Sequence, residues 1–210
     1  MDYQKLRKEM VEHQIKDRGI YNEKLLGVMM QIPRHLFVPE GMRDSAYDDN
    51  PLPIGSGQTI SQPYIVALMT ELLELRGDEN VLEIGAGSGY QAAILSKLAK
   101  RVYTIERVKE LADRTRELLR EYNYANVEVI HGDGTKGYPK EAPYDVIIVT
   151  AAADRVPQSL LEQLAEGGRL VAPLGPRYHQ ELVRIKKVSK DELQTEYFGG
   201  VIFVPLIGDG

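Results

Sequence analysis

The most informative absence from this sequence is cysteine, of which its 210 residues contain none. Without cysteine the chain can form no disulfide, use no thiol nucleophile and bind no zinc through thiolates. Its four histidines are scattered and show no H-E-x-x-H spacing, so the sequence predicts no metal site. The lack of cysteine also suits a reducing compartment, and we expect a cytoplasmic protein.

Two further absences concern membranes and nucleic acids. The charged start of the chain lacks the apolar region of a secretory signal, and no apolar run is long enough to cross a bilayer. The formal net charge is -5, the sequence pI is about 5.5, and lysine and arginine form no dense block. Because proteins that bind nucleic acids usually present a basic face, we expect no nucleic-acid partner. Because no apolar run is long enough to cross a bilayer, we expect no membrane partner. We also expect a monomer.

The chain has the size and texture of one domain. With 210 residues, 43% of them hydrophobic, it can bury a sizeable core, and no flexible linker or internal repeat divides it. Residues 1–77 combine helical patterns with a stretch rich in proline and glycine, whereas residues 78–210 alternate between strand and helix patterns. We expect a single domain over residues 1–210, with an N-terminal part and a core divided at these positions.

The N-terminal part is expected to form three helices around an irregular stretch. Apolar residues spaced between charges indicate a first helix that Gly19 closes. A second helix begins at the potential cap Asn22 and ends before Pro33. Residues 33–63 carry many prolines and glycines, so we expect an irregular but docked segment there, followed by a helix over 64–75.

The core shows a regular alternation of elements. Strand patterns at 80–84, 101–106, 126–130, 145–150 and 169–174 alternate with helix patterns at 91–99, 110–122 and 157–164. Such alternation predicts a parallel sheet covered by helices on both faces. Two further strand patterns flank the connection SKD, which predicts an antiparallel hairpin near the C-terminus. The predicted fold class is α/β: a doubly wound, mostly parallel, seven-stranded Rossmann-like sheet with an antiparallel C-terminal strand and an N-terminal helical cap.

The strongest local signal is the run VLEIGAGSGY at residues 81–90, which follows a strand and opens a helix. Gly85 and Gly87 allow a sharp backbone turn and let a ligand approach without meeting a Cβ atom. Tyr90 stands where a dinucleotide-binding loop would have its last glycine, so the pattern favours another adenosine-containing ligand over NAD. A tight strand-to-helix turn without a ligand is the plainer alternative.

Two carboxylates accompany these glycines. Glu106 ends the next strand, 21 positions after Gly85 (106 minus 85), where an acidic residue can accept both hydroxyls of a ribose. The alternative for Glu106 is a solvated strand end. Glu83 would be repelled by a pyrophosphate but would be favourable near an ammonium or a sulfonium group. Glu83 therefore points from NAD towards S-adenosylmethionine, unless it only binds backbone amides of the loop.

A second polar loop, HGDGTKG at residues 131–137, follows the third strand of the core. Asp133 could accept the amino group of an adenine, and Gly134 would leave its backbone open to the ring edge. A plain turn has the same composition. The ligand hypothesis gains support because ligands of open α/β sheets bind at the carboxyl ends of the strands, where the glycine run and Glu106 also lie.

The run GSGQTISQP at residues 55–63, named the hydroxyl loop below, is rich in glycine and in hydroxyl side chains. It lacks the lysine of a phosphate-binding loop, and no G-x-S-x-G nucleophile elbow is present in the chain. A carboxylate is already ionised near neutral pH, so it needs placement rather than a general base before it can attack. Thr59 and Ser61 are uncharged donors that can place it, although Ser61 could instead cap the following helix.

The chain closely resembles the protein-L-isoaspartate O-methyltransferase family, from about residue 5 to the ending FVPLIG. The resemblance is carried by PRHLFVP (33–39), YDDNPLPIGSGQTISQP (47–63), VLEIGAGSGYQAAILS (81–96), VYTIER (102–107), GDGTKG (132–137), YDVIIVTAA (144–152) and GGRLVAPLG (167–175). Many methyltransferases share the glycine run, whereas the hydroxyl loop is diagnostic of this family.

The resemblance implies an enzyme that transfers a methyl group from S-adenosylmethionine to the free α-carboxylate of L-isoaspartyl residues in damaged peptides and proteins, leaving S-adenosyl-L-homocysteine. It implies that Thr59 and Ser61 face the substrate carboxylate, and it suggests that Val204 or Leu206 covers the substrate. The implied cofactor site consists of Glu83, Gly85, Ala86, Gly87, Ser88, Gly89, Glu106, Arg107, Asp133, Gly134 and Thr150. The N-terminal part would carry the substrate loop, and the core would be a methyltransferase sheet that holds the cofactor.

Three other hypotheses stay open: another carboxyl or small-molecule methyltransferase, a nicotinamide-dependent oxidoreductase, and a cofactor-binding module without catalysis. Tyr90 and Glu83 count against the oxidoreductase, and the hydroxyl loop counts against the module. After the fourth core strand the chain reads TAAADRVP, without the Asn/Asp-Pro-Pro-aromatic motif of enzymes that methylate amines. Small Ala151 and Ala152 would leave room there for an extended peptide.

Overall fold

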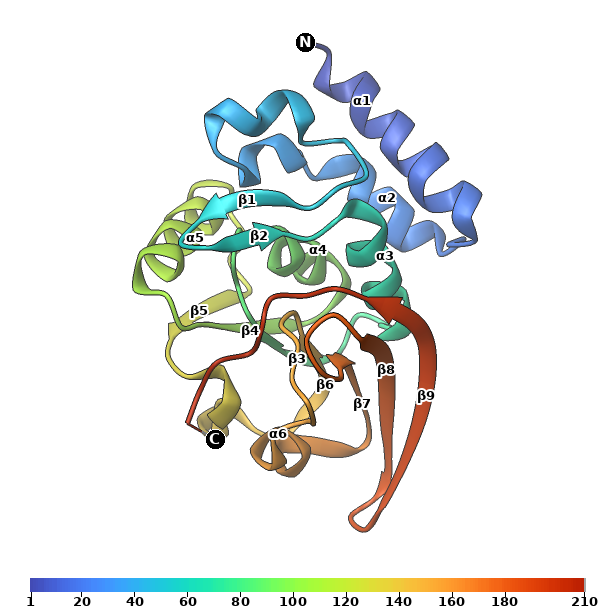
Figure 1. The fold of residues 1–210 in the computed structure, drawn as a ribbon, viewed down its shortest axis with the longest axis vertical. Helices are drawn as coiled ribbons and strands as arrows, with labels where there is room; N and C mark the ends of the chain where they lie inside the picture. The colour runs from blue at the N-terminus through green and yellow to red at the C-terminus, as the bar shows by residue number, and fades with distance from the viewer. Residues whose placement is uncertain (210) are drawn as a thin grey trace.

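A seven-stranded β-sheet runs through the centre of the protein (Figure 1), in a computed structural model that describes residues 1–209. Gly210, the last residue of the predicted core, lies outside the described residues. The strand order is β5-β4-β3-β6-β7-β8-β9. The strands are β3 (Asn80–Ile84), β4 (Arg101–Glu106), β5 (Val127–His131), β6 (Tyr144–Val149), β7 (Leu164–Leu174), β8 (Gln180–Ser189) and β9 (Glu192–Val201).

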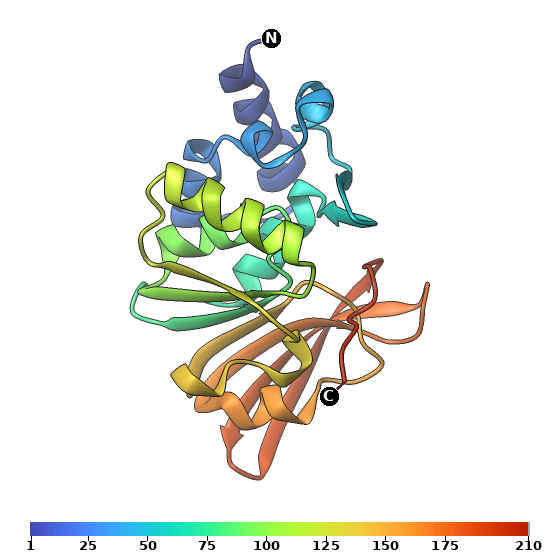
Figure 2. The same cartoon turned by 90° about the vertical axis from the view of Figure 1, so that its left-hand side faces the viewer.

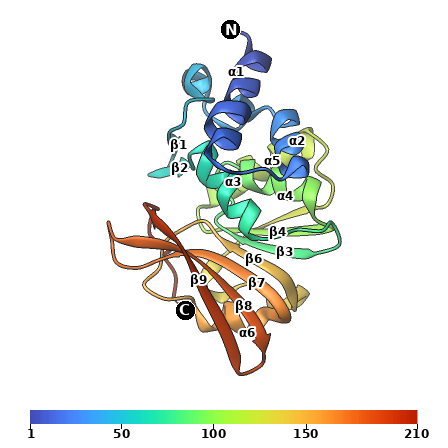
Figure 3. The ribbon, with the colours of Figure 1, turned by 90° about the vertical axis from the view of Figure 1, so that its right-hand side faces the viewer.

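The sheet is mostly parallel. Strands β3 to β7 pair in parallel, and β8 is antiparallel to both β7 and β9. The predicted fold class and the predicted C-terminal hairpin are confirmed, and Figure 3 shows that this β8–β9 hairpin projects past the other strands. Because the chain places β4 and β5 on one side of β3 and β6 on the other, the strand order reverses at β3. Open α/β sheets bind their ligands at such a reversal.

Helices cover both faces of the sheet (Figure 2). The helices on one face are α3 (Pro63–Leu72), α4 (Tyr90–Leu98) and α5 (Lys109–Glu121), and α6 (Gln158–Gln163) lies on the other. The central strands β3 and β6 are rich in valine and isoleucine and are buried over most of their length. This composition is expected for parallel strands between two helical layers, which have no solvated face to alternate with.

The N-terminal part begins with a helical cap. α1 (Tyr3–Glu9) continues through a π-helical turn, Met10–Ile15, and a short 3-10 turn to Gly19, whose φ of 98° ends the run. α2 (Glu23–Gln31) begins after Asn22, whose side chain accepts a backbone hydrogen bond from the first turn. The predicted helix ends at Gly19 and Asn22 are both confirmed.

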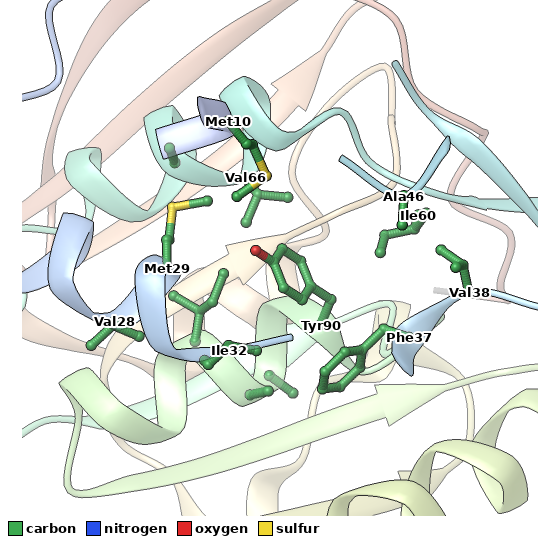
Figure 4. Close-up of a cluster of buried hydrophobic side chains, with 14 of the residues drawn as sticks. Met10, Val28, Met29, Ile32, Phe37, Val38, Ala46, Ile60, Val66 and Tyr90 are labelled. Atoms are coloured by element: carbon green, nitrogen blue, oxygen red, sulfur yellow. The ribbon is translucent and has the colours of Figure 1, made fainter. Parts of the chain in front are cut away.

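One buried apolar cluster joins this cap to the core (Figure 4). Tyr90, at the start of α4, lies near the centre of this cluster. Around it lie Met29 of α2, Val66 of α3, and Phe37 of the segment between these two helices. The rings of Phe37 and Tyr90 meet edge to face, with centroids 5.5 Å apart. The N-terminal part and the core therefore share one hydrophobic interior.

Residues 33–63 are more regular than their composition indicates. Their elements are the 3-10 helices Arg34–Phe37 and Glu40–Ser45 and the antiparallel strands β1 (Leu52–Gly55) and β2 (Gln58–Ile60). The turn between the strands places Ser56 at φ 52° and Gly57 at φ 71°, as in a two-residue hairpin turn. Strands of four and three residues are too short to show a clear alternating pattern, so the sequence indicated only a docked, irregular segment.

Two element boundaries differ from the prediction by three residues or more. α3 ends at Leu72 rather than at residue 75, and its N-cap is Gln62 without a capping side chain, so Ser61 does not cap it. Pro63 occupies the first helical position, where its fixed φ angle starts the helix without help from a hydroxyl. β7 begins at Leu164, directly after α6, rather than at residue 169. The pair Gly167 and Gly168, which is typical of a turn, lies inside β7, where the register with β6 shifts between Tyr144 and Val146.

No helix among residues 1–209 combines the length and the apolar character needed to cross a membrane. Within the same residues, no group of three or more histidine, aspartate and glutamate side chains is arranged to hold a metal ion.

Candidate active site

A cavity opens at the carboxyl ends of β3, β4 and β6, where the strand order reverses. Together with the solvent space at its mouth it spans about 960 Å³. The predicted site residues that line it are Thr59, Ser61, Gly85, Ala86, Gly87, Ser88, Glu106, Arg107, Gly134 and Thr150. The others, Glu83, Gly89 and Asp133, lie outside its lining.

The glycine loop (residues 85–89) turns sharply because its glycines adopt backbone angles that other residues avoid. Gly85 has φ 102°, Gly87 φ 50° and Gly89 φ 84°. A Cβ atom on Gly85 would overlap with the Thr150 hydroxyl, which lies within hydrogen-bond distance of the carbonyls of Ile84 and Gly85, at 2.9 and 2.8 Å. The close approach of Thr150 therefore requires glycine at position 85.

Glu106 ties the glycine loop to the connection before α5. One carboxylate oxygen accepts the backbone N–H of Gly87 at 2.9 Å, and the other accepts that of Val108 at 2.8 Å. The residue is 7% exposed and lines the cavity, so it is not a solvated strand end. Each oxygen keeps a second lone pair, and this carboxylate can therefore still accept ligand hydroxyls such as those of a ribose.

Glu83 is completely buried in β3, opposite Thr104 of β4 in the strand register. Neither of its carboxyl oxygens has a hydrogen-bond partner among residues 1–209, so it does not bind the loop amides. Burial raises the pKa of Glu83 to about 8; the Thr104 hydroxyl opposes this rise and Glu106 adds to it. At this depth burial favours the neutral carboxyl group over the charged one.

Asp133 is turned towards the end of the chain. One of its oxygens accepts the backbone N–H and the hydroxyl of Thr135 at 2.9 and 2.6 Å, and the other accepts the N–H of Asp209 at 2.9 Å. Burial by itself would raise the pKa of Asp133, but these hydrogen bonds and Lys136 lower it to about 2. Its neighbour Gly134 does line the cavity. The predicted contact between Asp133 and an adenine amino group stays a prediction.

The C-terminal segment (residues 202–209) forms one wall of the cavity, and Figure 1 shows it crossing the strand ends below the β1–β2 hairpin. The carbonyl of Val204 accepts the N–H of Ala152 at 2.8 Å, and the carbonyl of Ala152 accepts the N–H of Leu206 at 2.6 Å. These bonds hold the segment against the chain that leaves β6. Val204 and Leu206, which the resemblance suggested as covering residues, both line the cavity.

A second, more open groove adjoins the cavity. It encloses about 1600 Å³, part of it open to solvent, between the β7–β8 connection, the end of β9 and the hydroxyl loop. Two of its large apolar side chains, Tyr178 and Ile202, are 66% and 76% exposed. The residues that line both spaces are Thr59, Ser61, Thr150 and Val204. The hydroxyl loop therefore lies where the cavity and the groove meet.

The hydroxyls of Thr59 and Ser61 are not used inside the protein. Neither makes a hydrogen bond with any residue in the range 1–209. Thr59 is exposed and Ser61 is half-buried. In contrast, the backbone of the loop is held, because the carbonyl of Ser61 accepts a hydrogen bond from Arg34 at 2.7 Å. The loop has a fixed main chain and free hydroxyls.

The cavity lining contains few groups that could act as an acid or a base. Of the described residues, its ionisable members are Tyr90, Glu106 and Arg107. Both oxygens of Glu106 are bonded to amides, and burial raises the pKa of Tyr90 above its ordinary value. Arginine does not release its proton near neutral pH. No histidine, lysine or aspartate of residues 1–209 lines the cavity.

Part of the cavity wall was not predicted from the sequence. Val66 and Met69 of α3 and Val108 after β4 line the cavity together with Gln91 of α4. Gln91 could have been predicted, because it is a polar residue at the start of a mostly apolar helix. Its side-chain amide donates a hydrogen bond to the Thr70 hydroxyl at 2.9 Å. The apolar wall residues could not have been predicted from the sequence, because the wall of a cavity and a hydrophobic core have the same composition.

The family model that matches this chain and two curated relatives carry the same enzyme name. The family model for protein-L-isoaspartate(D-aspartate) O-methyltransferase (PCMT) matches residues 4–210. A curated protein-L-isoaspartate O-methyltransferase of Methanoculleus marisnigri is 58% identical over 96% of this chain and 91% of its own length. Another, of Syntrophus aciditrophicus, is 54% identical over 99% of this chain and 96% of its own length.

Solved structures agree with these relatives. A protein-L-isoaspartate O-methyltransferase matches with a TM-score of 0.86 at 30% identity, over 96% of this chain and 66% of that longer chain. A PCMT of Plasmodium falciparum in complex with S-adenosyl-L-homocysteine matches with a TM-score of 0.83 at 28% identity, over 96% of this chain and 98% of its own. This chain therefore belongs to the protein-L-isoaspartate (D-aspartate) O-methyltransferase family.

Proposed function

We propose that this protein is an enzyme that transfers a methyl group from S-adenosylmethionine to the free carboxylate of L-isoaspartyl residues in damaged peptides and proteins. Its family and the names of its relatives support the proposal. The observation that carries it is the position of Thr59 and Ser61, which line both the cavity beside the glycine loop and the adjoining groove. A cofactor in the cavity and a peptide in the groove would meet at these hydroxyls.

The cavity suits the cofactor chemically. The glycine loop offers bare backbone, and a Cβ atom on Gly85 would collide with Thr150. Glu106 lines the cavity and has lone pairs for ribose hydroxyls, whereas Glu83 lies behind the lining in β3. The Plasmodium falciparum relative was determined with S-adenosyl-L-homocysteine. When bound, S-adenosylmethionine would supply a methyl group on a positively charged sulfur.

Thr59 and Ser61 would hold and orient the substrate carboxylate. A carboxylate is ionised near neutral pH, so no proton has to be removed before it attacks. The lining supports a reaction without a general base, because its one carboxylate, Glu106, is already bonded to two amides. Placement for in-line attack can be worth roughly 7–11 kcal/mol, so orientation is the main catalytic contribution that we assign to this loop.

The two parts of the chain would supply the two sides of this site within a single domain. The hydroxyl loop belongs to residues 1–77 and the glycine loop to residues 78–210. The parts are in contact, because Arg114 of α5 donates a hydrogen bond to the carbonyl of Ile54 in β1 at 2.9 Å. We also propose a cytoplasmic monomer, which light scattering and cell fractionation would test.

Paired peptides test the proposed reaction. Two peptides of one sequence, with an L-isoaspartyl or an aspartyl residue at the same position, are incubated with the protein and methyl-labelled S-adenosylmethionine. We expect label in the isoaspartyl peptide alone, as a base-labile methyl ester. Equal label in both peptides, or label in neither, would refute the proposed specificity. Calorimetric binding of NAD in place of S-adenosylmethionine would refute the cofactor.

Alanine substitutions in the hydroxyl loop test the orienting role. Thr59→Ala and Ser61→Ala should each lower kcat by about tenfold or more, the usual worth of a hydrogen bond to a charged group, and leave the affinity for S-adenosyl-L-homocysteine unchanged. Ser56→Ala is the matched control, because Ser56 is exposed in the same hairpin and lines neither space. Weakened cofactor binding with an unchanged kcat would contradict the assigned role.

A further inference from the structure

Arg34 is buried more completely than arginines usually are. It belongs to the segment PRHLFVP and opens the 3-10 helix Arg34–Phe37, and its exposed fraction is 0%. It is among the largest fully buried side chains, and it lines neither the cavity nor the groove. Removing a charge from water is costly, so a buried guanidinium needs compensation from its surroundings.

Two backbone carbonyls and one aromatic ring surround the guanidinium. Nε donates to the carbonyl of Ala46 at 2.7 Å, and Nη2 donates to the carbonyl of Ser61 at 2.7 Å. Cζ lies 4.9 Å from the ring centre of Tyr90, which occupies the middle of the buried cluster in Figure 4. Nη1 has no hydrogen-bond partner among residues 1–209. Arg34 thus ties the hydroxyl loop to the chain that precedes β1.

The charge of Arg34 is not neutralised by a contacting carboxylate. Among the described carboxylates, Asp49 acts on the pKa of Arg34. However, one oxygen of Asp49 already binds Arg18 at 2.7 Å and Gln62 at 2.6 Å. Burial lowers the pKa of Arg34 to about 10, so the group is still charged at neutral pH. A positive charge therefore lies behind the Ser61 peptide group without an anion of its own.

We infer that Arg34 is a positioning residue for the anionic substrate: it fixes the Ser61 carbonyl, and its charge favours the isoaspartyl carboxylate at the hydroxyl loop. This inference rests on the proposed function. A charge that acts through a peptide group attracts the carboxylate without touching it, so the attacking oxygen is not occupied by an ion pair. The arriving carboxylate also supplies the anion that the buried guanidinium lacks, in surroundings where charges interact more strongly than at a solvated surface.

Peptide binding separates attraction by charge from general support of the loop. Two peptides of one sequence, one with an isoaspartyl carboxylate and one with the corresponding carboxamide, are titrated by calorimetry into the complex with S-adenosyl-L-homocysteine. Arg34→Met removes the charge at similar length, and Arg34→Lys retains it. Arg114→Met is the matched control, because Arg114 is exposed and donates to another carbonyl of the same hairpin, that of Ile54.

We expect Arg34→Met to reduce the preference for carboxylate over carboxamide by about tenfold or more, which is the usual worth of an interaction with a charged group. Its KM for the isoaspartyl peptide should rise, and its affinity for S-adenosyl-L-homocysteine should not change. Arg34→Lys should keep most of the preference, and Arg114→Met all of it. Equal weakening of both peptides would make Arg34 a purely structural residue and overturn the inference, as would an unchanged preference.

The wild type separates this inference from the proposed function. If the wild type does not methylate the isoaspartyl peptide, the proposed function fails. If it does so and Arg34→Met keeps the full preference, the inference alone fails. If Arg34→Met does not fold, Arg34→Lys decides: a lost preference overturns the inference, whereas a kept preference with a lower kcat, from the loss of one carbonyl contact, supports it.

Discussion

The buried carboxyl group of Glu83 should make the stability of the cofactor-free protein depend on pH. Burial raises its pKa in the folded chain from 4.5 to about 8. Between these values the folded state holds a proton that the unfolded state has released, so stability falls as the pH rises, by about 1.4 kcal/mol per pH unit. Because Glu83 is completely buried, solvent does not screen this effect, and over the whole window the loss is on the order of 5 kcal/mol.

Glu83→Gln removes this titration and keeps the shape of the side chain. The assay is urea unfolding of the wild type and the variant without cofactor, from about pH 5 to about pH 9. We expect the variant to gain stability relative to the wild type with each step in pH and to be the more stable protein at the alkaline end, because other titrating groups cancel in the difference. A difference that does not change with pH would refute the reasoning, since Glu83 would then be ionised in the folded chain.

Two other carboxylates give further predictions. Glu106→Ala leaves two backbone N–H groups without an acceptor. It should lower the free energy of unfolding in urea by roughly 2–4 kcal/mol and weaken cofactor binding tenfold or more. An unchanged free energy of unfolding and an unchanged affinity would contradict this prediction. The pKa of Asp133 is lowered from 3.8 to about 2 in the folded chain. Its ionised carboxylate therefore stabilises the folded chain above pH 3.8, and this contribution is lost as the pH falls from 3.8 to about 2. Asp133→Asn should therefore be less stable than the wild type at neutral pH, with the difference vanishing in acid, and its Asp209 amide should exchange hydrogen faster. Equal exchange rates would show that Asp133 does not hold the chain end.

Features that depend on neighbouring residues could be predicted from the sequence. The alternation of strands and helices after residue 78 predicted the sheet, and the spacing of Gly85 and Gly87 predicted a turn that opens a cavity. Features that depend on distant partners could not. Asp133 binds an amide 76 positions away, at Asp209, and nothing in the local run GDGTKG reflects that contact.

Arg34 illustrates the same limit. Its two partners are backbone carbonyls, at Ala46 and Ser61, and a carbonyl is present at every position of every chain. No pattern of side chains could therefore distinguish this buried arginine from a solvated one. The short strands β1 and β2 were missed for a related reason, since their pairing is set by a turn at Ser56 and Gly57 rather than by a long alternating run.

The contacts around Asp133 also bear on how this protein ages. Asp133 precedes Gly134, and a glycine amide can approach the carboxyl carbon of the aspartate before it with no side chain in the way. Attack there, with loss of water, would close a five-membered imide and could leave a branched main chain. In the fold, Thr135 and Asp209 hold the two oxygens and keep the group ionised, which makes it a poor electrophile. This member of an isoaspartate methyltransferase family thus contains an Asp-Gly sequence that could itself form isoaspartate. The hydrogen bonds to Asp133 in the fold oppose that reaction.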